Sequence, residues 1–362
     1  MRLLTRRETN TQARAGAIHA RALVCALFIL LSSCTTAPAT PTETTSDVEV
    51  PHARAWDKDP STITRDGRII AYAEYGDPEG APVIFMHGGP GSRFEGAILD
   101  RAAKQAGVRI IAPDRPGLGR SEMAAEVTLQ TTAEDVLFLS DALDLDRPVL
   151  MGWSGGGVPA VATGGAAPKH FAGVISLAGY TKLDREELEA MVPEPDQTAM
   201  QTMKKHPWRF RQFFRLTRFT ALRLSGTYWR TLVRDASDAD KRVYKTDGMR
   251  AFFMADQKEA LRPGIDGIIA DAKLSYAPDW GFSLEDSCIR VHIYHGTEDT
   301  RVPLAFAKDL AARFPEATLH TIDGVGHMFP ITHADRLVEQ ARMLWDTREA
   351  NCQRPESSVT PR

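Results

Sequence analysis

Long apolar runs, internal repeats and a strong net charge are all missing from this sequence. No apolar run is long enough to cross a bilayer, which takes about 20 residues in a helix. No repeat occurs at the period of a solenoid or propeller. The formal net charge of -3 gives no overall attraction to nucleic acid, so we expect no nucleic-acid partner. With 43% hydrophobic and 25% charged residues, the 362-residue chain suits one large domain, or a domain with an insertion.

The N-terminus has the pattern of an export signal. Five arginines precede a short apolar stretch at residues 22–31, which is the order of regions in a secretory signal peptide. Leu31-Ser32-Ser33-Cys34 resembles the lipobox of a bacterial lipoprotein, in which a diacylglycerol is attached to the cysteine and the chain is cleaved before it. This resemblance implies a signal peptide over residues 1–33, a lipid anchor on Cys34 and a place in the bacterial cell envelope. The alternative is an ordinary signal peptide in which Cys34 has no role.

Residues 34–60 are expected to form a flexible tether. Thr and Pro are frequent in this segment and apolar side chains are too few to pack. A tether after a lipid anchor would let the domain stand off the membrane. In an oxidising compartment, Cys288 and Cys352 either form a disulfide that joins the C-terminal tail to the domain or remain separate thiols. The sequence leaves both alternatives open.

From residue 61 onward, apolar runs alternate with helix-compatible segments. Asp66-Gly67 lies between two short runs and predicts a hairpin turn. The later runs are continuous and apolar, as in buried parallel strands, and each leads into a loop. The sequence therefore predicts an α/β fold with a mostly parallel sheet and helices on both faces. The runs interpreted as strands are residues 63–65, 68–72, 82–86, 109–112, 148–151, 173–178, 289–295 and 318–322.

The alternation stops between residues 180 and 285. This stretch has helical spacing and several prolines but no convincing buried strand, which predicts a helical cap inserted into the core. The core would then have two parts, residues 61–179 and 286–348. The polar tail at residues 349–362 is expected to be loose.

A possible nucleophile lies in Gly152-Trp153-Ser154-Gly155-Gly156. This pattern directly follows an apolar run and predicts a strand that enters a sharp turn, the shape of a nucleophile elbow. Such a serine needs strained backbone angles, and Gly152 and Gly156 leave room for the flanking turns. Gly-x-Ser-x-Gly also arises by chance, so its partners decide the interpretation.

An acyl-transfer serine needs a base and a carboxylate that orients the base. Asp299 follows the strand that ends at His295, and His327 follows the last strand. Serine, acid and histidine in this order, each at the carboxyl end of a parallel strand, can converge on one crevice. Glu298 is the neighbouring alternative for the acid, and a helix N-cap is the structural alternative for Asp299. His292, His295 and His320 are the expected bystanders.

The oxyanion of the reaction needs preorganised N–H donors. The natural pair is the backbone N–H of Gly155, after the nucleophile, and that of Gly89 in the loop His87-Gly88-Gly89-Pro90-Gly91. Glycine at both positions removes side chains that would obstruct close approach.

Together these motifs resemble the α/β-hydrolase superfamily, in the group with a helical cap, over about residues 63–345. The resemblance implies an eight-stranded sheet and a carboxylesterase-type serine hydrolase that cleaves a small to medium acyl ester, with no metal or organic cofactor. It also implies that His87 is structural, and that Asp114 fixes its own turn with Arg115 and Ser121. Serine at the nucleophile position argues against haloalkane dehalogenases and epoxide hydrolases, which use aspartate there.

Two other functions stay open. The loop at His87 to Gly91 is similar to that of proline iminopeptidases, but those enzymes usually carry Gly-Gly-Ser-Trp-Gly at the elbow, whereas here Trp153 precedes the serine. An aminopeptidase also needs acidic residues that hold a free amine, and a binding protein anchored in the envelope could keep the fold without turnover. The acidic candidates in the early cap are Glu186, Glu187, Glu189 and Glu194.

The cap contains a basic stretch without acidic residues. Between Lys204 and Arg234 there are nine Lys or Arg residues and no Asp or Glu, and aromatic and aliphatic residues lie among them. Such a stretch could lie on an anionic membrane surface. The alternative is a cap helix that packs its aromatic residues over the pocket and leaves its arginines in water.

Overall fold

An eight-stranded sheet with the strand order β1-β2-β4-β3-β5-β6-β7-β8 forms the core of the protein. The computed structural model describes residues 50–352 except 52, 58 and 195. Only the β1–β2 and β2–β4 pairs are antiparallel, so the predicted mostly parallel sheet is confirmed. The strands are β1 (Ser61–Arg65), β2 (Arg68–Gly76), β3 (Ala81–Met86), β4 (Val108–Pro113), β5 (Val149–Trp153), β6 (Gly173–Leu177), β7 (Val291–Gly296) and β8 (Ala317–Ile322).

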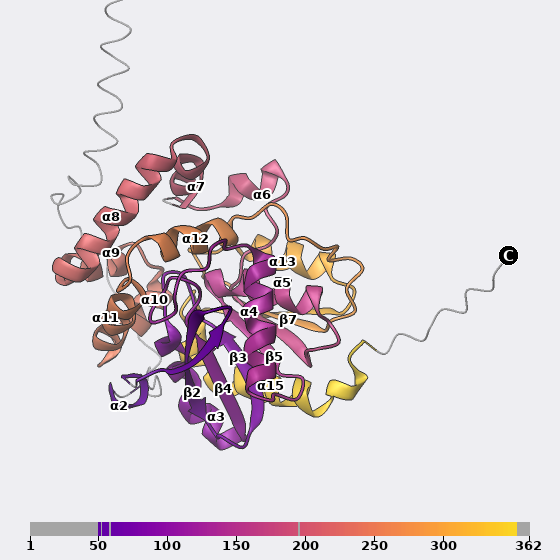
Figure 1. Cartoon of the computed structure of the whole chain (residues 1–362). Coiled ribbons are helices and arrows are strands. Elements are labelled where there is room, and N and C mark those ends of the chain that lie inside the picture. The colour runs from indigo at the N-terminus through magenta and orange to yellow at the C-terminus, as the bar shows by residue number, and fades with distance from the viewer. Residues whose placement is uncertain (1–49, 52, 58, 195, 353–362) are drawn as a thin grey trace, which may run out of the picture. The chain divides into compact units, whose positions relative to one another are not determined.

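Helices cover both faces of this sheet (Figure 1). Successive side chains of a strand point to opposite faces, and in β3 both sets are buried. Phe85 packs in the cluster that contains α3 and α15, whereas Ile84 packs in the cluster that contains α4, α5 and α13. This two-sided burial explains why the strands read as continuous apolar runs. The helices are α3 (Asp100–Ala106), α4 (Leu129–Ala142), α5 (Gly157–Ala166), α13 (Leu304–Arg313) and α15 (Ala334–Asp346).

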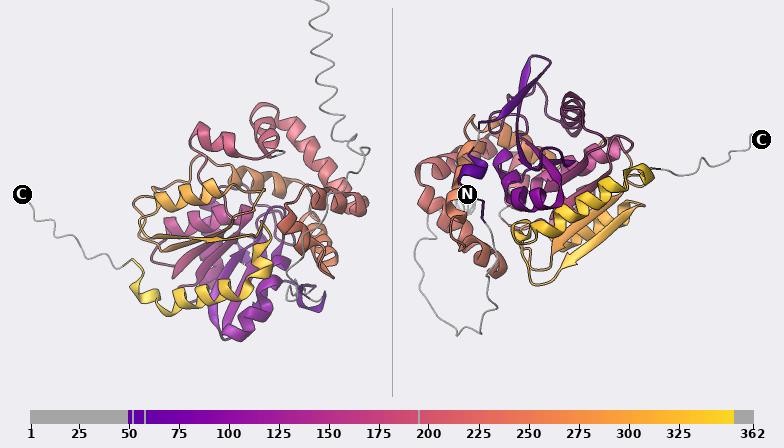
Figure 2. Two further views of the ribbon diagram at one scale, coloured as in Figure 1. Left: turned by 180° about the vertical axis from the view of Figure 1, so that it is seen from behind. Right: turned by 90° about the horizontal axis from the view of Figure 1, so that it is seen from below.

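In the described residues between β6 and β7 there are seven helices, within the segment predicted as a cap. Hydrogen bonds from α11 and α12 reach the loops after β3 and β4, so these two helices lie over the carboxyl ends of the central strands (Figure 2). Pro207 begins the longest of the seven, where its missing N–H costs no helical hydrogen bond. The helices are α6 (Glu186–Met191), α7 (Asp196–Lys205), α8 (Pro207–Arg223), α9 (Ser225–Arg234), α10 (Asp238–Tyr244), α11 (Met249–Ala260) and α12 (Asp266–Ser275).

The end of the expected tether is folded rather than flexible. Residues Ala53–Trp56 form helix α2, and the Trp56 ring lies 5.5 Å from the Phe94 ring and 6.0 Å from the Phe252 ring. Val50 also packs against the core. The prediction of a tether up to residue 60 is therefore wrong for its last part, because two large apolar side chains have partners in the domain. The expected signal peptide, Cys34 and the first part of the tether lie outside the described residues.

The start of the predicted loose tail is also packed. Residues Arg348–Ala350 form a short 3-10 helix, and the buried Asn351 side chain donates hydrogen bonds to the carbonyls of Pro168 and Phe171. Cys352 forms a disulfide with Cys288, the first of the two alternatives that the sequence left open. Among the described residues, no helix has the length and apolar character needed to cross a membrane.

Candidate active site

Ser154 lies at a sharp turn between β5 and α5. Its φ of +53° is in the left-handed region, which non-glycine residues rarely adopt without a functional reason. A side chain at Gly152 would collide with the Gly156 carbonyl, and one at Gly156 would collide with the carbonyls of Met86 and His87. The two flanking glycines are therefore required by close backbone approach, as the sequence predicted. The serine faces a cavity of about 340 Å³ beneath the cap.

Asp299 and His327 form a hydrogen-bonded pair at the same cavity. The Asp299 side chain is fully buried, and its Oδ2 lies 2.8 Å from His327 Nδ1. Its Oδ1 accepts hydrogen bonds from the backbone N–H groups of Arg301 (2.8 Å) and Val302 (3.0 Å). Asp299 therefore fixes its own turn and also holds the histidine. Glu298, the alternative acid, is exposed to solvent.

The charges of this pair shift both pKa values in the direction that keeps the pair ionised. Burial alone would raise the pKa of Asp299, but the charge and hydrogen bond of His327 outweigh it and lower that pKa. Burial alone would lower the pKa of His327, but Asp299 outweighs it and raises that pKa. A histidine held at Nδ1 by a carboxylate presents Nε2 to the cavity, where Ser154 also lies.

Gly89 and Gly155 lie side by side next to Ser154. A side chain on Gly155 would come within 3.4 Å of the Gly89 nitrogen. Gly155 is in the first turn of the 3-10 helix Ser154–Gly156, where N–H groups have no acceptor within the helix. The Gly89 N–H has no acceptor among the described residues, whereas the neighbouring Gly88 N–H donates to Glu95 Oε2 at 2.6 Å. Two N–H groups are thus available at the position expected for an oxyanion.

The loop that carries Gly89 is held by buried polar side chains. His87 Nδ1 lies 2.7 Å from the Gly88 carbonyl, and its Nε2 accepts the backbone N–H of Arg115. Burial and the Arg115 charge lower the pKa of His87 well below its usual value, so this histidine is neutral and serves the loop, as expected. The Arg115 guanidinium donates to the carbonyls of His87 and Gly88.

The role expected for Asp114 is wrong in its partners. Asp114 accepts from the side chain of Arg93 (2.8 Å) and from the backbone N–H groups of Arg93 and Arg120. Arg115 pairs instead with Asp271 on α12 (2.6 Å), and the Ser121 hydroxyl accepts the backbone N–H of Ala71. Asp114 thus does hold its own turn, through the Arg120 N–H, but Arg93 and Asp271 lie outside the local motif, which could not indicate them.

This arrangement of strands, elbow and loops matches a known family. Residues 81–334 match the model of the alpha/beta hydrolase fold, which covers more than half of the chain. The chain belongs to this family. It is 29% identical to a proline iminopeptidase from Xylella fastidiosa, over 75% of this chain and 92% of the relative.

Two further proteins show how varied the similar proteins are. The chain is 29% identical to a pimeloyl-[acyl-carrier protein] methyl ester esterase from Aromatoleum aromaticum, over 70% of this chain and 93% of the relative. Its fold resembles the crystal structure of a bromoperoxidase from Bacillus anthracis with a TM-score of 0.61 and 20% identity, over 79% of this chain and 99% of the other. Membership of the alpha/beta hydrolase family therefore establishes a hydrolase-type fold and leaves the substrate open.

The cavity of this hydrolase fold has mostly apolar and aromatic walls, with four charged side chains among them: Glu95, Asp196, Asp271 and Arg301. The sequence indicated none of its three acidic side chains. Asp196 Oδ2 accepts a hydrogen bond from the Tyr180 hydroxyl at 3.3 Å, whereas Glu95 and Asp271 accept from the Gly88 N–H and from Arg115. None of the four early-cap glutamates reaches this cavity, and Glu189 pairs instead with Lys204. The apolar and aromatic lining includes Phe210, Phe213, Phe214, Tyr228, Tyr244, Phe253, Ile268 and Tyr276.

Of the expected bystander histidines, only His295 lies near the site. Its Nε2 lies 3.6 Å from Asp299 Oδ2 but has a closer partner in the Val302 carbonyl at 2.8 Å. Burial lowers its pKa, so His295 stays neutral beside the carboxylate. His292 and His320 stack on one another with ring centroids 5.3 Å apart.

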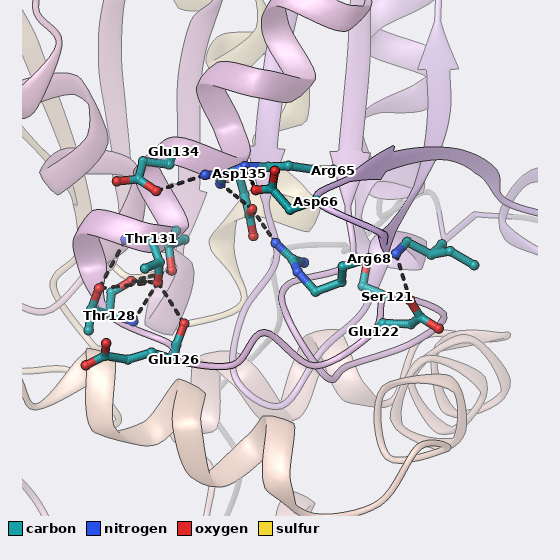
Figure 3. Close-up of polar contacts among 12 residues, drawn as sticks. Arg65, Asp66, Arg68, Ser121, Glu122, Glu126, Thr128, Thr131, Glu134 and Asp135 are labelled. Carbon is teal, nitrogen blue, oxygen red and sulfur yellow. Dashed lines mark hydrogen bonds and ion pairs between the residues drawn. The ribbon is translucent and has the colours of Figure 1, made fainter.

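A larger and more open hollow of about 1170 Å³ lies elsewhere, beside the β1–β2 hairpin and the start of α4. Figure 3 shows four of its charged side chains paired with one another: Arg65 and Arg68 both contact Asp135, and Arg65 also contacts Glu134. Its lining contains no histidine or cysteine. Because this hollow lacks a histidine held by a carboxylate beside a strained serine, the smaller cavity at Ser154 is the better candidate despite its size.

Proposed function

We propose that the protein is a serine hydrolase that cleaves a small to medium acyl ester through an acyl-serine intermediate. The observation that carries the proposal is the convergence at one cavity of a strained Ser154, the Asp299–His327 pair and the available Gly89 N–H. No single one of these features would be sufficient, because each also has a structural explanation.

In this mechanism the Ser154 hydroxyl attacks the ester carbonyl carbon while His327 Nε2 takes the hydroxyl proton. The new C–O bond places negative charge on the carbonyl oxygen, which the N–H groups of Gly89 and Gly155 stabilise. Asp299 stabilises the histidine cation. Collapse of the intermediate expels the alcohol, which receives the proton from His327. A water molecule then releases the acid by the same steps in reverse order.

The apolar walls of the cavity support an acyl ester as substrate. Aromatic side chains such as Phe210 and Phe214 favour an uncharged group beside the reacting carbonyl. Hydrolysis of p-nitrophenyl esters of graded acyl length, measured beside proline β-naphthylamide, tests this choice. We expect ester cleavage with a preference for one range of chain lengths. Cleavage of the amide alone would contradict the esterase proposal.

A second candidate, an aminopeptidase of the proline iminopeptidase type, is supported by Asp196. This carboxylate faces the cavity with Tyr180 as its hydrogen-bond partner, so it could hold a substrate amine. Burial raises its pKa, which opposes the charge that such a role needs. If the protein is an aminopeptidase, Asp196→Asn will raise KM for proline β-naphthylamide and leave KM for p-nitrophenyl esters unchanged.

We also propose that the mature protein is exported and lipid-anchored to a bacterial membrane through Cys34. The support is the sequence around Leu31-Ser32-Ser33-Cys34 and the preceding apolar stretch. Expression with a radiolabelled fatty acid tests this: the wild-type chain should incorporate label and Cys34→Ser should not. Equal labelling of both would contradict the proposal.

A further inference from the structure

The outer face of α8 exposes apolar side chains. Trp208, Phe213, Leu216 and Phe219 are exposed by 62%, 48%, 49% and 53%, and Leu224, directly after the helix, by 47%. These are five of the nine large hydrophobic side chains that are exposed in the described part of the chain. A contiguous exposed apolar patch of this kind marks an interaction site more often than scattered single residues do.

Three arginines share this side of the helix. Arg209, Arg215 and Arg223 are exposed, and none has a carboxylate partner among the residues that the structure describes. The Arg209 guanidinium lies 5.3 Å from the centre of the Trp208 ring. We call this surface the α8 face: Trp208, Arg209, Phe213, Arg215, Leu216, Phe219, Arg223 and Leu224.

The opposite side of α8 already has its own apolar set. Phe210 and Ala221 are buried in a cluster with Leu261 of the α11–α12 connection. Phe210 and Phe214 also line the cavity at Ser154. The inner side of the helix therefore packs on the domain and forms part of the cavity wall. On the α8 face, only Phe213 among the described residues also lines the cavity.

The charge of this region is one-sided. No acidic residue occurs between residues 197 and 234, so α8 and α9 have no negative side chain, and the one on α7, Asp196, lines the cavity at Ser154. Arg211 and Arg218 are used within the fold, by Asp266 and by the Leu261 carbonyl respectively. The arginines of the α8 face remain available to an anionic partner.

We propose that the α8 face binds an anionic lipid bilayer. Apolar and aromatic side chains interleaved with arginines are typical of a helix that lies in the membrane interface, with its apolar groups at the boundary of headgroups and acyl chains. Each such cation raises the affinity for an anionic membrane by a factor of about five. The α8 face therefore provides both contributions on one helix.

The expected anchor is compatible with this orientation. Cys34 lies sixteen residues before Val50, which packs against the domain, and sixteen extended residues span at most about 55 Å. A lipid on Cys34 and the α8 face can therefore engage the same membrane. The α8 face would add a second attachment to a single lipid anchor, and two attachments are what stable binding usually requires. Binding by the α8 face does not depend on the chemistry at Ser154.

Co-sedimentation of the full chain with vesicles tests the proposal. Vesicles of phosphatidylglycerol and phosphatidylcholine are compared with vesicles of phosphatidylcholine alone. Arg215→Gln with Arg223→Gln should weaken binding to the anionic vesicles by about 30-fold, because two cations are lost. Trp208→Ser with Phe219→Ser should weaken binding to both kinds of vesicle by about ten-fold or more.

Matched controls change the same chemistry at other surfaces. Lys169→Gln with Lys308→Gln removes two exposed cations of the core, and Met191→Ser with Met343→Ser removes two exposed apolar side chains. Neither control should change vesicle binding, and all four variants should keep the wild-type melting temperature. Equal losses in the controls and in the α8 variants would overturn the proposal.

A fluorescence measurement distinguishes membrane binding by the α8 face from membrane binding by residues 1–49, which all variants share. Trp208 is the most exposed tryptophan in the described residues. Brominated anionic vesicles should quench part of the tryptophan fluorescence of the wild type, and this part should vanish in Trp208→Phe but persist in Trp345→Phe. Quenching that is unchanged in Trp208→Phe would overturn the proposal. So would a lipid-free dimer that Trp208→Ser with Phe219→Ser dissociates, because the α8 face would then bind a second copy.

Discussion

Asp240 on cap helix α10 holds the loop that carries His327. Its Oδ2 accepts the backbone N–H of His327 at 3.1 Å, and its Oδ1 accepts that of Met328 at 2.8 Å. The carboxylate is buried, and its charge also contributes to the raised pKa of His327. The cap therefore positions the base of the proposed triad as well as covering the cavity.

We expect Asp240→Asn to lower kcat/KM by about ten-fold, because an amide can accept only one of the two N–H groups and leaves the other unpaired. His327 must be neutral to accept the serine proton, so kcat/KM falls as pH drops through its pKa. Loss of the Asp240 charge lowers that pKa, and the acid limb of the profile should move to lower pH. Asp238→Asn, an exposed change on the same helix, is the control. A profile that is unchanged or displaced to higher pH would contradict this role.

The acid of the proposed triad can be tested against its neighbour. Asp299→Asn should reduce kcat by about 10³ to 10⁴, because an amide donor at this position favours the wrong tautomer of His327. Glu298→Gln should leave kcat unchanged, since Glu298 is exposed and has no contact with the histidine. Steady-state rates with a p-nitrophenyl ester distinguish the two. A large loss of kcat in Glu298→Gln alone would indicate that Glu298, and not Asp299, is the acid of the triad.

A buried carboxylate under the Gly89 loop makes stability depend on pH. Asp256 accepts hydrogen bonds from the backbone N–H and hydroxyl of Ser92, and burial raises its pKa to about 7. Because the folded state holds this proton more tightly than the unfolded chain does, the free energy of unfolding should fall as pH rises from about 4 to about 7. The loss between pH 5 and pH 7 is up to about 3 kcal/mol.

Asp256→Asn should reduce this pH dependence, since asparagine carries no titrating proton and can still accept from Ser92. Urea unfolding at pH 5, 6 and 7 measures it, with Asp238→Asn as the control. If the wild type and Asp256→Asn lose stability equally over this range, the pH dependence comes from the titration of another group. Glu95 is the alternative carrier, because burial and the nearby Asp256 charge raise its pKa as well.

The disulfide between Cys288 and Cys352 should contribute to stability without affecting the chemistry. It closes a loop with a sequence separation of 64, which in the chain-entropy description is equivalent to about 4 kcal/mol. Cys288→Ser with Cys352→Ser should lower the melting temperature and leave kcat/KM at 25 °C unchanged, because neither cysteine lines the cavity. A loss of activity at a temperature where the variant is still folded would contradict this separation.

The positions of the strands along the chain and the local motifs could be predicted from the sequence because each depends on a few neighbouring residues. The run before Ser154 is apolar since β5 is buried on both faces, and the glycines at 152 and 156 report the close backbone contacts of the turn. Asp299 and His327 were placed by their position after strands, and the structure brings them together.

The hydrogen bonds between the cap and the core could not be predicted from neighbouring residues in this way. The pairs Asp240 with His327, Asp256 with Ser92 and Asp271 with Arg115 join residues 87, 164 and 156 positions apart. A single sequence gives each of these acids the appearance of an ordinary helical residue, because its partner is set by how the cap packs. Trp56 and Asn351 also have partners far along the chain, in Phe94 and Phe171, so the sequence around each indicated only a loose end.

Covalent labelling tests whether Ser154 is the nucleophile. The full chain is incubated with a fluorophosphonate probe, digested and mapped by mass spectrometry, beside Ser154→Ala and heat-denatured wild type. We expect one adduct, on Ser154, that is absent in both controls and forms at least about 10³ times more slowly in Asp299→Asn. Folded protein that cleaves esters but carries its adduct on another residue, or folded protein without any adduct, would contradict this expectation.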